Sequence, residues 1–103
     1  MSRAALNTVL ELTEKQWQGQ VVSLARQLGW HVYHTYDSRR SQPGFPDLVL
    51  LRERVVFVEL KTAQGKLTDA QSDWLVALSN AGAETYVLRP QDLDSAAELL
   101  KRR

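Results

Sequence analysis

The sequence predicts an α/β domain in which a mixed β-sheet is flanked by helices. Three observations support this class: two Thr-x-x-Gln motifs that mark helix starts, three strand-length segments in succession, and a helical segment between the third of them and a fourth. Strands joined by short turns pair antiparallel, whereas a crossover through a helix makes two strands parallel. The expected order is therefore α-β-β-β-α-β, followed by a final helix.

The first helix is expected to begin at Thr13. Thr13 and Gln16 have the spacing of a capping box. Apolar residues then recur at helical spacing and define one buried face, namely Trp17, Val21, Leu24, Ala25 and Leu28. Gly29 is suited to end the helix. Glu14 lies on the same face, which is unusual for a packing helix; the alternative is a first-turn glutamate favoured by the helix dipole.

Three strands are predicted next, over residues 31–36, 48–51 and 55–61. A polar loop of residues 37–44 separates the first two, and Arg52-Glu53-Arg54 should join the last two in a tight hairpin.

The second helix should begin at Thr68, because Thr68 and Gln71 repeat the capping-box spacing, and it should end near Gly82. Its expected apolar face carries Gln71 as well as Trp74, Leu75 and Leu78, with Trp74 in the core. A fourth strand is predicted over residues 83–88. The final helix carries Leu93, Ala96, Ala97 and Leu100.

Composition narrows the classes of function. The 103 residues fit a single domain, 1–103. The absence of cysteine excludes disulfides and thiolate zinc sites, and two histidines are too few for a His-rich site, so a metal would need oxygen ligands, as Mg²⁺, Mn²⁺ or Ca²⁺ do. No apolar run is long enough to span a bilayer, and the N-terminus lacks a signal-peptide pattern. We therefore expect a cytoplasmic protein without membrane contact.

The stretch GFPDLVLLRERVVFVELK, residues 44–61, carries charged residues at the edges of apolar strands. Glu59 and Lys61 are two residues apart and should point to the same side of their strand. The hairpin should bring Asp47 beside Glu59, and Glu14 can reach the same place. Crowded carboxylates repel each other unless a cation lies between them. Three carboxylates and a lysine are therefore expected at one edge of the sheet.

A divalent cation would resolve this repulsion. Its expected ligands are Asp47, Glu59 and the backbone carbonyl of Leu60, with Glu14 acting through a water molecule or directly. A metal there could polarise a phosphoryl oxygen and lower the pKa of a bound water. Lys61 could hold the attacking water or neutralise charge in the transition state. This combination suits the hydrolysis of a phosphodiester.

These residues resemble the PD-(D/E)xK nuclease motif, with Pro46-Asp47 as its first half and Glu59-Leu60-Lys61 as its second. The run LKTAQGKLTDAQSDWL resembles the VRR-NUC branch of that superfamily, and the resemblance extends over residues 14–90. It implies a restriction-endonuclease-like fold. The catalytic residues that it implies are Glu14, Asp47, Glu59, Lys61 and Gln71. Glu11 lies near Glu14, so either glutamate could be the helix-borne ligand; the position of Glu14 on the helix favours it.

The resemblance further implies a stand-alone domain of the kind found in bacterial viruses, which would act in the cytoplasm of the host. It implies a Mg²⁺-dependent endonuclease, with Mn²⁺ as a substitute, that cuts branched DNA in the manner of a Holliday-junction resolvase and works as a homodimer. Flaps, linear duplex or RNA are alternative substrates, and a non-catalytic DNA-binding module is the alternative of another class.

DNA contacts are expected from Arg39, Arg40 and Ser41 in the polar loop and from Lys66 after the catalytic strand. The alternative for each is a solvated surface position.

Overall fold

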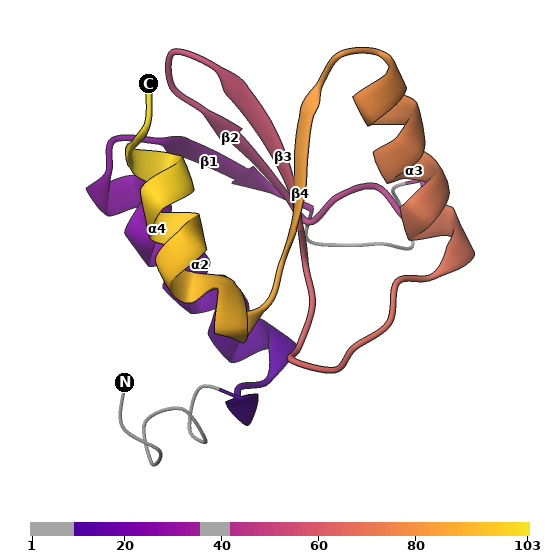
Figure 1. The fold of residues 1–103 in the computed structure, drawn as a ribbon, viewed down its shortest axis with the longest axis horizontal. Helices are drawn as coiled ribbons and strands as arrows, with labels where there is room; N and C mark the ends of the chain where they lie inside the picture. Colours follow the sequence, from indigo (N-terminus) through magenta and orange to yellow (C-terminus); the bar gives the residue numbers. More distant parts are fainter. Residues whose placement is uncertain (1–9, 36–41) are drawn as a thin grey trace.

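The computed structural model describes residues 10–35 and 42–103, and its elements follow the predicted order (Figure 1). They are α2 (Glu14–Gln27), β1 (His31–His34), β2 (Leu48–Leu51), β3 (Val55–Leu60), α3 (Asp69–Asn80), β4 (Glu84–Leu88), the 3-10 turn η1 (Pro90–Asp92) and α4 (Leu93–Lys101). The predicted α/β class is confirmed. Within these two ranges, no helix is long and apolar enough to cross a bilayer.

The four strands form one mixed sheet in the order β1-β2-β3-β4. β1 pairs antiparallel with β2 and β2 with β3, whereas β4 runs parallel to β3 after the crossover through α3. The β2–β3 hairpin is as tight as predicted, with the Arg52 N–H donating to the Arg54 carbonyl at 3.1 Å. β1 is shorter than predicted: it ends at His34, and residue 36 lies outside the described ranges.

Both predicted capping boxes are present and have matching dimensions. In α2, the Thr13 hydroxyl accepts from the Gln16 N–H at 3.1 Å, and the Gln16 side chain accepts from the Thr13 N–H at 2.9 Å. Thr68 and Gln71 form the same two bonds, at 3.1 Å and 2.9 Å, at the start of α3. These bonds satisfy backbone donors that a helix start otherwise leaves unpaired.

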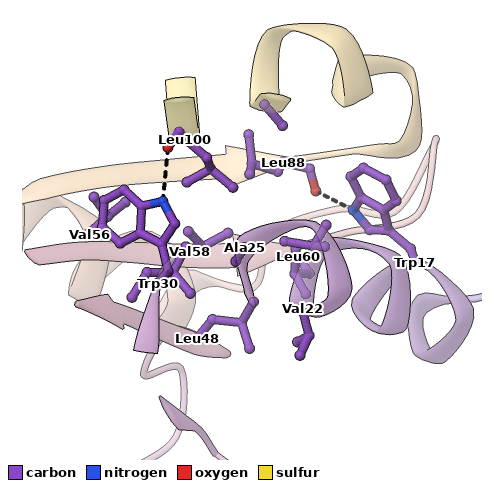
Figure 2. Close-up of a cluster of buried hydrophobic side chains, with 13 residues drawn as sticks. Trp17, Val22, Ala25, Trp30, Leu48, Val56, Val58, Leu60, Leu88 and Leu100 are labelled. Atoms are coloured by element: carbon purple, nitrogen blue, oxygen red, sulfur yellow. Dashed lines mark hydrogen bonds between the residues drawn. The ribbon is translucent and has the colours of Figure 1, made fainter. Parts of the chain in front are cut away.

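The hydrophobic core lies on one face of the sheet, where α2 and α4 pack side by side (Figures 1 and 2). Two buried tryptophans join its parts through their indole N–H groups. Trp17 donates to the Leu88 carbonyl at 2.9 Å, which ties α2 to β4, and Trp30 donates to the Leu100 carbonyl at 2.9 Å, which ties the start of β1 to α4 (Figure 2). The core therefore satisfies the polar atoms of its largest side chains.

The opposite face of the sheet is only partly covered. Phe45 packs edge-on against Phe57 and against Trp74 of α3, with ring centroids 6.1 Å and 5.2 Å apart. No residue of α3 is buried, so the prediction that Trp74, with its neighbours on α3, forms a core face was wrong. The reason is geometric: α3 lies against the β4 side of the sheet and leaves the β1–β2 side open among the described residues.

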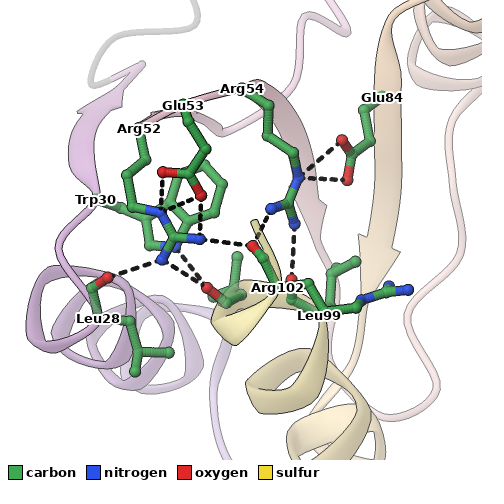
Figure 3. A network of polar contacts seen from close by, with 9 residues as sticks. Leu28, Trp30, Arg52, Glu53, Arg54, Glu84, Leu99 and Arg102 are labelled. Atoms are coloured by element: carbon green, nitrogen blue, oxygen red, sulfur yellow. Dashed lines mark hydrogen bonds and ion pairs between the residues drawn. The ribbon is translucent and has the colours of Figure 1, made fainter.

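Two arginines of the β2–β3 turn hold the ends of two helices (Figure 3). The Arg52 guanidinium donates to the Leu28 carbonyl at the end of α2, at 2.9 Å, and to the Leu100 carbonyl of α4, at 3.0 Å. Arg54 donates to the Leu99 carbonyl at 2.7 Å. Both guanidinium groups also lie over the Trp30 ring, 4.5 Å and 5.0 Å from its centroid. These cations thus occupy the negative ends of the helix dipoles.

Candidate active site

The open end of the β2–β3 hairpin brings two carboxylates together. Leu48 pairs with Val58, so Asp47 and Glu59 are the next residues along the two strands. One Asp47 oxygen, Oδ2, accepts a hydrogen bond from the backbone N–H of Leu60 at 2.8 Å. This bond fixes the Asp47 side chain against the end of β3. The expectation that the hairpin places Asp47 beside Glu59 agrees with this geometry.

Glu59 is 1% exposed, and its two oxygens have different surroundings. Oε1 accepts a hydrogen bond from the side-chain amide of Gln71 at 3.2 Å. Oε2 is buried and has no hydrogen-bond partner within the described part of the chain. A buried oxygen without a partner costs free energy, which points to a ligand that a bare protein does not supply.

Burial raises the pKa of Glu59 from its ordinary 4.5 to about 9. The neighbouring Asp47 carboxylate acts in the same direction, because it favours the protonated form of Glu59 and repels the charged form, and Glu14 adds a smaller repulsion. The positive charge of Lys61 opposes these effects. A carboxyl group with this pKa is neutral at pH 7 in the metal-free protein.

A third carboxylate completes the cluster. One oxygen from each of Glu14, Asp47 and Glu59 lies within 4.8 Å of the other two. Their exposure is graded, from the exposed Glu14 through the half-buried Asp47 to the buried Glu59. Of the two glutamates considered from the sequence, Glu14 belongs to this group and Glu11 does not. The capping box at Thr13 places Glu14 in the first turn of α2, facing the end of the hairpin.

Lys61 directly follows β3 and is 8% exposed. Its backbone N–H continues the pairing with β4 by donating to the Leu88 carbonyl at 3.2 Å. Its positive charge acts on the carboxylates, because it lowers the pKa of Glu59 against the effect of burial. The sequence predicts a lysine at this edge of the sheet beside three carboxylates, and Lys61 directly follows the strand that carries Glu59.

The loop after Lys61 is held by Arg89, a residue that no sequence motif singles out. The Arg89 guanidinium donates to the carbonyls of Thr62, at 2.9 Å, and Gly65, at 2.5 Å. Gln91 donates to the Ala63 carbonyl at 3.0 Å. Only its place at the end of β4, opposite the end of β3, could have indicated this contact.

Gly44 brings the loop before Asp47 against the first turn of α3. Its φ of +88° lies in the left-handed region, and a Cβ there would come within 2.4–2.7 Å of backbone atoms of Ala70 and Gln71. No other residue fits without displacing the helix. Gly44 therefore sets the approach of α3, and with it of Gln71, to the carboxylates.

Of the four residues predicted to contact DNA, the structure describes only Lys66. Lys66 is exposed in the segment between β3 and α3. Arg39, Arg40 and Ser41 lie outside the described ranges.

The donor set is chemically suited to a hard divalent cation. Every side-chain group of the cluster is an oxygen donor, and one of its buried oxygens has no other partner. Oxygen ligands are those that Mg²⁺ and Mn²⁺ prefer.

Comparisons with known proteins find similarity in sequence and in fold. The family model described as "VRR-NUC domain" matches residues 4–92. A solved structure titled "VRR_NUC domain protein" is similar, with a TM-score of 0.72 and 19% sequence identity over 87% of this chain and 86% of that one. No curated protein matches the chain.

Proposed function

The chain belongs to the VRR-NUC domain family of the PD-(D/E)xK nucleases, and on that premise we propose that it is a metal-dependent endonuclease that hydrolyses phosphodiester bonds in branched DNA. The observation that carries the proposal is the buried Oε2 of Glu59, which lacks a partner and lies in a cluster with two more carboxylates. A module that only bound DNA would repel phosphates with these groups. A cation bound among them reverses this repulsion.

The metal in this proposal is Mg²⁺, with Mn²⁺ as a substitute. Asp47, Glu59 and the backbone carbonyl of Leu60 would hold it, and Glu14 would act directly or through a water molecule. When bound, such an ion polarises a phosphoryl oxygen and lowers the pKa of a coordinated water. Asp47 is held in one orientation at this place, because the Leu60 N–H donates to its Oδ2.

Lys61 and Gln71 serve the same centre in different ways. The Lys61 ammonium neutralises the charge that builds up on the phosphate oxygens and holds the attacking water. Gln71 donates to Oε1 of Glu59 and keeps that carboxylate in one orientation. A cation held beside Glu59 would lower its pKa and release its proton to solvent, because positive charge at this place would offset the burial and the neighbouring acids that raise the pKa.

DNA would approach the cluster from the edge of the sheet where Glu14 is exposed. Lys66, which follows the catalytic strand and is exposed, is placed to meet a phosphate in this proposal. Arg39, Arg40 and Ser41 are proposed as further phosphate contacts from the segment before Gly44. The proposed location of the reaction is the cytoplasm, that of the host cell if the chain is viral.

The proposed active form is a symmetric homodimer, and the open sheet face supports it. Tyr33, Leu51 and Val55 are 67%, 48% and 43% exposed, although they belong to strands of the sheet. The strand register puts Leu51 beside both His31 and Val55 on one face. A DNA-binding surface would carry cationic side chains there, whereas a second copy of the chain offers the same apolar face across a two-fold axis. A Leu51→Glu variant should sediment as a monomer where the wild type sediments as a dimer; a monomeric wild type would end this part of the proposal.

One experiment tests the catalytic proposal and the substrate class together. Purified protein is incubated with Mg²⁺ and a four-way junction, a flap, a linear duplex, single-stranded DNA or RNA, beside an Asp47→Ala control. Cleavage of the junction first, lost in the control and without Mg²⁺, is expected. Preferred cleavage of another substrate would correct the substrate class, and binding without any cleavage would replace the enzyme with a binding module.

A further inference from the structure

We propose that Thr68 is a positioning residue for the metal centre. Through the capping box of α3 it fixes the Gln71 side chain, so that Gln71 occupies Oε1 of Glu59 and Oε2 stays available for the cation. This inference rests on the proposed function, because it concerns the same site. Thr68 itself touches neither the carboxylates nor a substrate in this scheme, and it acts only through Gln71.

The Gln71 amide has one acceptor end and one donor end, and the structure uses both. Its oxygen accepts from the Thr68 backbone N–H at 2.9 Å, and its nitrogen donates to Oε1 of Glu59 at 3.2 Å. A reversed amide would put the amide oxygen against a carboxylate and the NH₂ group against an N–H donor. The capping box thus decides which end of the amide faces Glu59.

The Thr68 hydroxyl completes the arrangement by accepting from the Gln71 N–H at 3.1 Å. It closes a ring of two hydrogen bonds that joins residues 68 and 71, so the start of the helix and the side chain are fixed together. The backbone at Gly44 packs on the same turn and limits its movement from the other side. Loss of the hydroxyl should free the first turn and, with it, the amide.

The chain contains a matched reference for this device. Thr13 and Gln16 form a capping box with the same two distances at the start of α2. Gln16, however, is exposed and lines a surface groove with Gly19 and Gln20, away from the carboxylates. Both boxes cap a helix, but only in α3 does the glutamine of the box also donate to a carboxylate of the cluster. Gln16 is therefore the reference for loss of the glutamine side chain alone, because the Thr13 hydroxyl still caps α2 and keeps Glu14 in its first turn.

The test compares Mn²⁺ affinity, measured by calorimetry, with the melting temperature of the metal-free protein. Thr68→Val should weaken Mn²⁺ binding by about tenfold or more, the usual cost of removing a residue that orients a metal ligand. Thr68→Ser should restore wild-type affinity. Gln16→Ala loses only the exposed bond from the Thr13 N–H and keeps the Thr13 hydroxyl cap, so it should lower the melting temperature by no more than about 4 °C and bind Mn²⁺ as the wild type does.

Thr68→Gly separates positioning from stability, because glycine is a tolerated N-cap but lacks the hydroxyl. It should weaken Mn²⁺ binding with little change in melting temperature. Wild-type affinity in both Thr68→Val and Thr68→Gly would overturn the role of Thr68 while the metal site stands. An equal loss of affinity in Gln16→Ala would also overturn it. Failure of the wild type to bind Mn²⁺, or undiminished binding in Asp47→Ala, would instead overturn the proposed function.

Discussion

The two ends of the β2–β3 hairpin gather charges of opposite sign and treat them differently. At the turn, Arg52 and Arg54 donate to backbone carbonyls that two helices leave unpaired, and Glu53 and Glu84 balance their charge. At the open end, three carboxylates face the single positive charge of Lys61, and one buried oxygen of Glu59 has no partner within the described residues.

The charges at the turn stabilise the fold, whereas the carboxylates at the open end have hydrogen bonding that only a ligand would complete. A buried or half-buried charge whose hydrogen bonds are complete contributes to folding, and its removal leaves its partners unpaired. A buried acid with an incomplete set of bonds and a raised pKa opposes folding and marks a site with another task. The same hairpin therefore presents a structural end and a functional end, and each can be tested by removing its charges.

The largest expected effect is on catalysis at the functional end. Lys61→Ala should reduce cleavage of the best DNA substrate by about 10²–10⁴-fold, the range expected for loss of a residue that handles a proton or charge at the reacting group. Its melting temperature should change little by comparison. Single-turnover cleavage rates and thermal denaturation measure the two effects. A Lys61→Ala protein that cleaves at the wild-type rate would remove the lysine from the mechanism.

A second effect concerns stability at the same end. Glu59 keeps its proton up to a pH of about 9 in the fold, but only up to about 4.5 in the unfolded chain. Between these values the folded state binds more protons, so the metal-free protein should lose stability as the pH rises, by up to about 1.4 kcal/mol per pH unit. Glu59→Gln imitates the protonated side chain and should be the more stable protein at pH 8.

Urea denaturation of the metal-free wild type and of Glu59→Gln at pH 5, 7 and 9 measures this difference. The variant should also fail to bind Mn²⁺, so that a gain in stability accompanies a loss of function. If the difference in stability between the wild type and Glu59→Gln were the same at pH 9 as at pH 5, the pKa of Glu59 would not be raised in the folded protein.

The third effect is at the structural end. Arg52→Met keeps the apolar stem over Trp30 but leaves the Leu28 and Leu100 carbonyls without the guanidinium. Because the Arg52 side chain is only 17% exposed and hydrogen bonds to charged groups contribute strongly, we expect a loss of about 2–3 kcal/mol in the free energy of unfolding. Cleavage per folded molecule should be unchanged. Arg26→Met, at an exposed position of α2, is the control and should have little effect.

Local patterns predicted most of the fold. The two Thr-x-x-Gln motifs gave both helix starts correctly, because a capping box is decided by four neighbouring residues. The alternation of β3 correctly separated Glu59 from the core residues Val58 and Leu60, since the strand period is local as well. Local patterns could not predict how deeply α3 is buried against the sheet. It depends on how a helix meets a sheet far away in the sequence, and Trp74 therefore looked like a core residue.

The candidate site shows the same contrast between residues predicted from local patterns and contacts between distant segments. Asp47, Glu59 and Lys61 were recognised from their positions at strand ends, and Glu14 from its place on the helix. Three further contacts join segments that are distant in the sequence and could not be predicted. Gln71 donates to Glu59, Arg89 donates to the loop after Lys61, and Gly44 packs against α3. The arginines of the turn were recognised as part of a hairpin but not as caps of two helices, for the same reason.

The smallest effect sharpens the description of the structural end. Glu53 forms an ion pair with Arg52, and the hydrogen bond from Arg52 lowers the pKa of Glu53. The Glu53 side chain is nevertheless 40% exposed, and water screens the pair. Glu53→Gln should therefore leave the melting temperature within about 1–2 °C of the wild type, which corresponds to a few tenths of a kcal/mol in a domain of this size. If Glu53→Gln instead unfolds the protein as readily as Arg52→Met, the ion pair and not the carbonyl contacts holds the turn end together. If it has no effect, the stabilising role of Arg52 lies in the two helix ends that it joins.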